Sequence, residues 1–250
     1  MKYWKVKKMN KVKKAIIMAA GFGSRMQPLT FKTPKPLIKV NGKRMIETVI
    51  EGLHENGITE IYVVVGYLGE QFKYLEEKYS QLKLITNPYY DTANNISSLY
   101  VASNVLDDAT IILDGDQIIK NSQILQAEFD YSGYSCSKVN EETDEWVLQL
   151  DSHDVITSCN RNGGKDGWRL YSISRWTKDD AITLKKQIQY EFDKKNTRDV
   201  YWDDIPMFYY FENYKLKGYK ISATDIEEVD SLSELIQIDS SYQEVIEDEK

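Results

Sequence analysis

The sequence predicts an α/β protein with a mixed, mainly parallel sheet that carries helices on both faces. Apolar, strand-like segments at 14–19, 61–65, 82–86 and 110–113 alternate with helical stripes through the first half of the chain. This order favours parallel strands joined by helices, and such sheets bind their ligands beyond the carboxyl ends of the strands. The 250 residues suffice for one large domain or two small ones.

Three helical stripes lie between these strands. Apolar residues recur every three or four positions in the segments 44–56, 69–79 and 94–105, which predicts helices with one buried face. The first of them ends at Gly57, a residue type that commonly terminates helices.

The second half is less regular. Aromatic, alternating segments at 145–150, 168–175 and 207–211 predict strands that extend the sheet and cover its active face, and 178–195 predicts a helix. No linker rich in Pro, Gly or Ser separates the two halves. We therefore predict a single domain at 14–240, with the halves meeting near residue 120.

Composition and charge exclude several classes of protein. The net charge is −7, but residues 1–14 hold seven lysines and no acid, so the remainder carries −14. An acidic body argues against a nucleic-acid-binding protein, and we interpret 1–13 as a solvated basic arm and 241–250 as an acidic tail. Two cysteines and two histidines argue against a disulfide scaffold and a zinc site. No apolar run is long enough for a membrane span, and no signal peptide is evident, so we expect a cytoplasmic protein.

A glycine loop with two nearby cations follows the first strand. Glycines at 21 and 23 let backbone N–H groups approach a phosphate closely. Arg25 inside this loop and Lys35 in a proline-flanked turn suit a triphosphate, whose leaving group gains charge during phosphoryl or nucleotidyl transfer. Met26 replaces the third glycine of a dinucleotide fingerprint, which counts against NAD. Taken singly, either cation fits a surface position beside a structural turn equally well.

The segment 15–37, AIIMAAGFGSRMQPLTFKTPKPL, resembles the signature of the nucleotidyltransferases that activate sugar phosphates and phosphocholine. Further similar segments lie at 66–72, 94–99, 201–204 and 228–231. Together they resemble the bacterial CTP:phosphocholine cytidylyltransferases in particular, over roughly residues 14–238. Gln27 departs from the pattern, because many relatives carry a second basic residue there, and one triphosphate contact is lost.

The resemblance implies a Rossmann-like fold of the nucleotide-diphospho-sugar transferase type. It also implies a reaction in which CTP and phosphocholine give CDP-choline and pyrophosphate, with 14–120 as the nucleotide-binding half and 121–240 as the substrate-binding half. By the same resemblance, Arg25 and Lys35 hold the triphosphate and act in catalysis. The predicted nucleotide-binding residues are Ala20, Gly21, Phe22, Gly23, Asn87, Asn94, Ser98 and Asp114.

Asp114 and Asp116 follow an apolar strand, where open α/β sheets place function. Mg²⁺ binds a few carboxylates together with phosphate oxygens and water. Taken alone, Asp-Gly-Asp is more often a plain turn. The resemblance supplies Asp230 as a partner for Asp116, which lies further out than Asp114, so we predict that Asp116 and Asp230 hold Mg²⁺ with Glu228 behind them.

Aromatic residues stand beside acids in the second half. A quaternary ammonium binds by cation–π contact, helped by nearby negative charge. Composition alone also fits a half-buried sheet with acids at its rim, but the resemblance at 201–204 favours a choline site made of Tyr201, Trp202 and Asp203, with Trp146 as a further wall.

Several alternatives stay open. Aminoethylphosphonate carries a primary amine that the same acids could bind, and a sugar 1-phosphate is a further acceptor. An inactive, nucleotide-binding regulatory domain is the alternative from another class. Nothing in the sequence decides between a monomer, a homodimer and a fusion to another domain.

Overall fold

The computed structural model describes residues 9–243, and a nine-stranded sheet runs through it. Most of the predicted basic arm and acidic tail therefore lies outside the described residues. The sheet is built around four parallel strands, which are β2 (Lys14–Ala19), β5 (Glu60–Val65), β6 (Leu82–Thr86) and β7 (Thr110–Asp114). β2 is central and pairs with β5 on one side and β7 on the other, as the alternating sequence pattern predicts.

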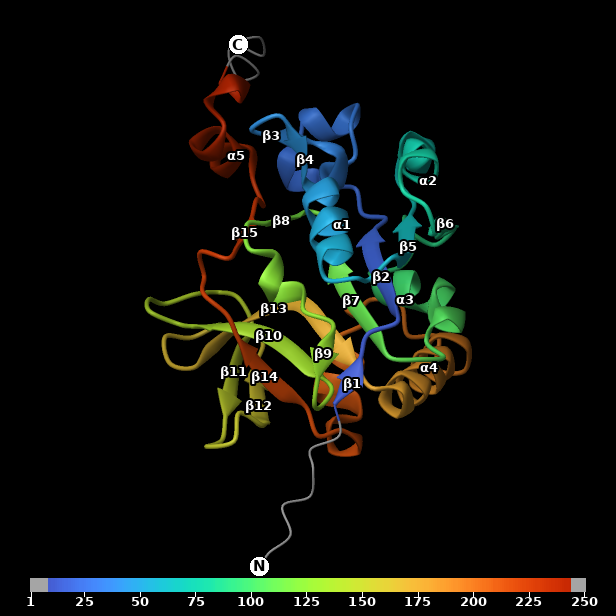
Figure 1. Ribbon diagram of the computed structural model, residues 1–250, viewed down its shortest axis with the longest axis vertical. Helices are drawn as coiled ribbons and strands as arrows, with labels where there is room; N and C mark the ends of the chain where they lie inside the picture. Colours follow the sequence, from blue (N-terminus) through green and yellow to red (C-terminus); the bar gives the residue numbers. More distant parts are fainter. Residues whose placement is uncertain (1–8, 244–250) are drawn as a thin grey trace, which may run out of the picture.

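The second half continues the same sheet. β13 (Trp168–Trp176) pairs antiparallel with β7 and joins the remaining strands to it. These are β10 (Gly133–Lys138), β11 (Val147–Leu150), β12 (Ile156–Asn160) and β14 (Lys217–Lys220). They form the lower left part of Figure 1. The predicted strands at 145–150 and 168–175 are thus confirmed as β11 and β13.

Helices cover both faces because the central strands are apolar on both sides. In β2, Ala15 and Ile17 enter one buried cluster while Ile16 and Met18 enter the other. The first cluster packs against α1 (Met45–Glu55) and α2 (Tyr74–Lys78), and the second against α3 (Ile96–Val101) and α4 (Lys178–Asp193). Figure 1 shows α3 and α4 below α1 and α2, with β2 between α1 and α3.

The predicted strand at 207–211 is wrong. Residues Ile205–Tyr209 form a π-helical turn, and the N–H of Tyr210 donates to the carbonyl of Ile205 at 2.9 Å. Pro206 cannot donate to a strand ladder but is well tolerated in a first helical turn, which explains the difference. The helix predicted at 94–105 is also shorter than expected, because α3 ends at Val101 and a 3₁₀ turn follows at Ser103–Val105.

Three two-stranded sheets lie outside the nine-stranded sheet of the described residues. β8 (Gln117–Ile119) pairs antiparallel with β15 (Ile226–Glu228), which brings residues near 116 beside those near 230. After β15 comes α5 (Leu232–Ile238), and the chain also forms the pairs β3 (Lys39–Val40) with β4 (Lys43–Arg44) and β1 (Asn10–Lys11) with β9 (Glu128–Phe129).

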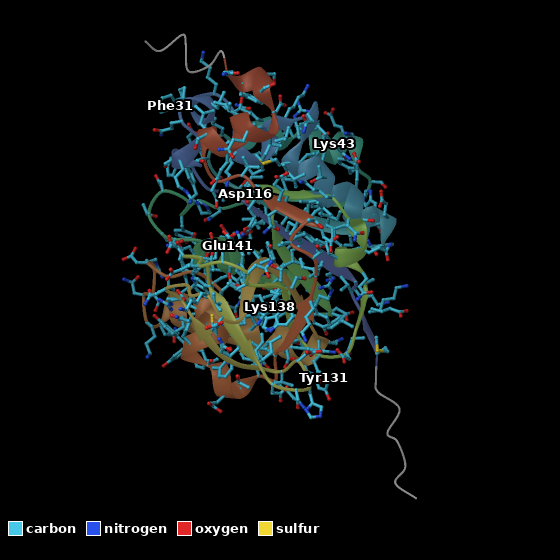
Figure 2. The ribbon with its side chains drawn as sticks, turned by 90° about the vertical axis from the view of Figure 1, so that its left-hand side faces the viewer. Phe31, Lys43, Asp116, Tyr131, Lys138 and Glu141 are labelled. Carbon is cyan, nitrogen blue, oxygen red and sulfur yellow. The ribbon has the colours of Figure 1, made fainter. Side chains whose placement is uncertain are left out.

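Figure 2 places Asp116 at mid-height, between the region of Phe31 and Lys43 and the region of Lys138 and Tyr131. Asp116, a predicted metal ligand, therefore lies where the two halves of the chain meet. Among residues 9–243, no helix has the length and apolar character that crossing a membrane requires.

Candidate functional site

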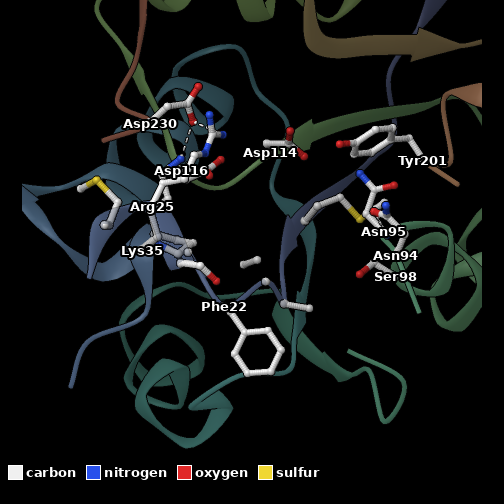
Figure 3. Close-up of a pocket in the computed structure, with 18 residues that line it drawn as sticks. Phe22, Arg25, Lys35, Asn94, Asn95, Ser98, Asp114, Asp116, Tyr201 and Asp230 are labelled. Carbon is white, nitrogen blue, oxygen red and sulfur yellow. Dashed lines mark hydrogen bonds and ion pairs between the residues drawn. The ribbon is translucent and has the colours of Figure 1, made fainter. Parts of the chain in front are cut away.

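A buried lysine joins two aspartates that are far apart in the sequence. The Nζ of Lys35 lies 2.8 Å from Oδ2 of Asp116 and 2.9 Å from Oδ1 of Asp230. Arg25 reaches the same Asp230 oxygen, with its Nη2 at 3.0 Å. Figure 3 shows these four side chains on one side of a cavity. The structure therefore brings together the two cations and the two acids that the sequence analysis selected.

The neighbouring charges favour the ionised forms of Lys35 and Asp230. Burial works against the charge of Lys35, which is 8% exposed, but Asp116 and Asp230 outweigh it and raise the pKa of Lys35. Burial similarly opposes the charge of Asp230, while Lys35 and Arg25 hold its pKa below the ordinary value. A phosphate ligand that draws Lys35 or Arg25 away therefore leaves carboxylates whose charge another cation must balance.

The glycine loop is shaped to hold Lys35. Gly23 has a left-handed backbone with φ of 61°, and a Cβ at this position would lie 2.9 Å from the Cβ of Lys35. Any larger residue would therefore push the lysine away from the loop. Only a 3₁₀ turn, Ser24–Met26, follows the loop, so no long helix points its amino end at the site.

The loop lines a cavity of about 530 Å³. Asn94, Asn95, Ser98 and Tyr201 form its opposite wall, and Figure 3 shows them facing Arg25 and Lys35 across the cavity. The predicted nucleotide-binding residues in its lining are Ala20, Gly21, Phe22, Gly23, Asn94, Ser98 and Asp114. The volume of this cavity lies in the range that small-molecule ligands occupy.

Asn87 does not line this cavity. It is 1% exposed, and its Nδ2 donates to the hydroxyls of Ser97 at 2.9 Å and Ser98 at 3.1 Å. It therefore positions Ser98 from behind rather than meeting a ligand. Asn95, which the sequence analysis did not select, lines the cavity, and its Oδ1 accepts from the backbone N–H of Trp202 at 2.8 Å. The sequence could have indicated Asn95, because this residue lies in the segment 94–99, which resembles the cytidylyltransferases.

Asp114 lies at the end of β7, between the two walls. Burial and the charge of Asp116 raise its pKa well above the ordinary value. These surroundings favour the protonated form of the carboxyl, which can donate a hydrogen bond. This differs from Asp116, which bonds Lys35 as a carboxylate acceptor.

A second cavity of about 410 Å³ shares Arg25, Lys35, Asp116 and Asp230 with the first and extends toward the strands of the second half. Trp146, Tyr201 and Asp203 line it, as do Asp144, Glu145, Arg161, Leu170, Ser172, Gln117 and Glu228. The wall is rich in acids, so it suits a ligand group that carries positive charge.

Trp202 lies elsewhere, and its predicted place in the wall needs correction. Its side chain is 1% exposed and packs in the core, with ring centroids 6.1 Å from Trp176 and 6.2 Å from Tyr134. The neighbouring Tyr201 is 49% exposed and lines both cavities. The turn at this point gives adjacent residues opposite directions, which no periodic pattern could predict.

A buried acid and a half-buried acid line the second cavity. Burial raises the pKa of Asp203 to about 7, although a hydrogen bond with Tyr134 opposes this. Burial also raises the pKa of Glu228 to about 7, although Arg169 opposes this, and Gln117 donates to Glu228 at 2.9 Å. Burying a carboxylate is costly, so Asp203, which lines the cavity, is a candidate for contact with a ligand.

The donor set fits a magnesium ion. Asp116 and Asp230 both bond one ammonium nitrogen, so their carboxylates are close enough to share a cation. No cluster of three or more acids, histidines or cysteines suited to a metal occurs between residues 9 and 243. Two carboxylates agree with the habit of Mg²⁺, which takes one or two together with phosphate oxygens.

Comparisons with known proteins identify similar sequences. Residues 14–137 match the nucleotidyl transferase family. A 2-aminoethylphosphonate cytidylyltransferase from Lancefieldella rimae is 41% identical over 229 residues, which cover 91% of this chain and 92% of that protein. A choline-phosphate cytidylyltransferase from Streptococcus pneumoniae is 37% identical over 200 residues, which cover 77% of this chain and 82% of that protein.

Solved structures agree in fold. The structure of the CTP:phosphocholine cytidylyltransferase from Streptococcus pneumoniae superimposes with a TM-score of 0.83 at 31% identity, covering 92% of this chain and 99% of that chain. An inositol-1-phosphate CTP transferase from T. maritima superimposes with a TM-score of 0.73 at 16% identity, covering 94% of this chain and 96% of that chain. The predicted fold of the nucleotide-diphospho-sugar transferase type is thereby confirmed.

Proposed function

Because this chain belongs to the nucleotidyl transferase family, we propose that it transfers CMP from CTP to a small acceptor with a phosphate or phosphonate at one end and an ammonium group at the other. Relatives that share 34–41% of their residues with most of this chain are cytidylyltransferases. The observation that carries the proposal is the meeting of Arg25, Lys35, Asp116 and Asp230 beside the glycine loop.

The charges of this cluster suit nucleotidyl transfer. An acceptor oxygen attacks the α-phosphorus of CTP in line, a new P–O bond forms, and the bond to the bridging oxygen of pyrophosphate breaks. The acceptor oxygen is already anionic, so no general base is required. Lys35 and Arg25 neutralise the repelling phosphates and the departing pyrophosphate, which is the main catalytic task in such a reaction.

Asp116 and Asp230 would hold Mg²⁺ together with phosphate oxygens. When bound, the ion supplies positive charge that stabilises the crowded phosphates. Both carboxylates bond Lys35, which places the ammonium group of this lysine beside the proposed metal ligands and next to the glycine loop.

We propose 2-aminoethylphosphonate as the preferred acceptor. Its ammonium group has N–H donors, and the carboxylate of Asp203 is an acceptor group in the lining of the second cavity. The burial of Trp202 also removes one of the rings that a cation–π site for choline would use. The relative from Lancefieldella rimae acts on this compound and spans most of the chain.

Phosphocholine is the second candidate. Trp146 and Tyr201 line the cavity with ring centroids 6.1 Å apart, and aromatic faces of this kind attract a quaternary ammonium. The relative from Streptococcus pneumoniae acts on it. So does a choline-phosphate cytidylyltransferase from Haemophilus influenzae, which is 34% identical over 223 residues. This reverses the order of the two acceptors given by the sequence analysis.

A pyrophosphate-release assay tests the proposal. CTP, UTP and dTTP are crossed with aminoethylphosphonate, phosphocholine and glucose 1-phosphate in the presence of Mg²⁺. We expect the highest kcat/KM for CTP with aminoethylphosphonate, and release by Lys35→Ala that is slower by about a hundredfold. A clear preference for glucose 1-phosphate, or no release with any pair, would contradict the proposed function.

A further inference from the structure

An arginine side chain packs against the aromatic rings beside the second cavity. Arg161 follows β12, and its guanidinium carbon lies 4.3 Å from the ring centroid of Phe208 and 5.5 Å from that of Trp146. These two rings are themselves 5.3 Å apart, in an edge-to-face arrangement. Arg161 and Trp146 both line the second cavity. The aromatic faces that a ligand cation would seek are thus shared with an arginine.

A buried acid holds this arginine in place. The Nη2 of Arg161 forms an ion pair with Oδ1 of Asp204, a residue that is 1% exposed. The other oxygen of Asp204 accepts from the backbone N–H of Tyr201 at 2.9 Å. One carboxylate therefore connects the arginine to the backbone of a cavity-lining tyrosine, and swinging Arg161 away would leave a buried charge unpaired.

The residue before Asp204 offers a different kind of contact. Asp203 lines the cavity and is 7% exposed, and the hydroxyl of Tyr134 interacts with its carboxyl group. An ammonium group with N–H donors can bond a carboxylate at this place. A trimethylammonium group has no such donor and depends on ring faces, where it meets the like charge of Arg161.

We propose that Arg161 is a specificity-determining residue that disfavours fully methylated ammonium groups and leaves the acceptor's cation to Asp203. This inference rests on the proposed function, because it concerns the acceptor of the same reaction. It predicts that the methylation state of the acceptor nitrogen, rather than its charge, controls the acceptor KM.

A series of N-methylated aminoethylphosphonates isolates this effect, because only the number of methyl groups changes. For the wild type we expect kcat/KM to fall by about tenfold or more from the ammonium to the trimethylammonium member. Arg161→Gln should reduce this ratio by about tenfold through the acceptor KM, with the KM for CTP unchanged. Lys165→Gln is the matched control, since Lys165 is an exposed cation of the same β12–β13 connection, and it should keep the wild-type ratio.

The variant Arg161→Gln/Asp204→Asn removes both charges of the pair and covers the case in which the single variant fails to fold. It should show the same reduced ratio. An unchanged ratio in the folded variants would overturn the inference, and so would an equal loss for every acceptor, which would mean that Arg161 binds the phosphonate. A wild type that prefers the trimethylammonium member overturns the inference while cytidylyl transfer stands. A wild type that releases no pyrophosphate with any member overturns the proposed function and the inference with it.

Discussion

Replacing Asp203 with asparagine should stabilise the protein in a way that depends on pH. The side chain is 7% exposed, and burial raises its pKa from 3.8 to about 7. Asparagine has a similar shape and carries no charge, so the substitution removes the cost of burying a carboxylate while largely preserving the packing.

The sign follows from where the proton is held. Below pH 4 the carboxyl is neutral in both the folded and the unfolded chain, so wild type and Asp203→Asn should be equally stable. Between pH 4 and pH 7 the unfolded chain releases the proton and the folded chain keeps it, so the wild type loses stability as the pH rises. The shift of about three pKa units corresponds to about 4 kcal/mol, and this difference should be complete above pH 7.

Urea denaturation at half-unit steps from pH 5 to pH 8 measures this difference. The advantage of Asp203→Asn should grow by about 1.4 kcal/mol per pH unit up to pH 7 and then level off. Asp91→Asn, at an exposed position, is the control and should show no such trend. A constant difference between wild type and Asp203→Asn across this range would refute the reasoning. The same variant should raise the KM for aminoethylphosphonate, because the ammonium loses its acceptor.

Three further predictions concern the cluster at the glycine loop and the core beneath the second cavity. Lys35→Ala should lower kcat by about a hundredfold, since a preorganised charge on the phosphates is lost, and a normal kcat in steady-state assays would remove Lys35 from catalysis. Asp230→Asn should raise the Mg²⁺ concentration for half-maximal rate by about tenfold or more, measured by titration at saturating CTP; an unchanged requirement would exclude Asp230 as a ligand. Trp202→Ala should lower the free energy of unfolding by about 3–5 kcal/mol, because it empties a core position. If Trp202→Ala kept native stability and raised only the KM for the acceptor, Trp202 would be part of the acceptor site and not of the core.

Local sequence patterns were sufficient for the parallel part of the sheet and for the glycine loop. In β2, every second residue enters the same buried cluster, so a short apolar run already implies a strand covered on both faces. The loop and its two cations are contiguous in sequence, and their chemistry can be interpreted without knowing the rest of the fold. The resemblance to a known family added Asp230, which lies in a segment whose composition alone indicates only a solvated acid.

The convergence of distant side chains is a property of the folded chain. Lys35 and Asp230 are 195 positions apart, yet the pairing of β8 with β15 brings Asp230 beside Asp116 and the lysine between them. Tyr201 and Trp202 are neighbours, but a turn sends one to the cavity and the other to the core. Arg161 escaped the sequence analysis because it stands in a connection without periodicity. Hydrophobic spacing reports which side of a regular element is buried, whereas the direction of a side chain in an irregular segment depends on contacts between residues that are remote in sequence.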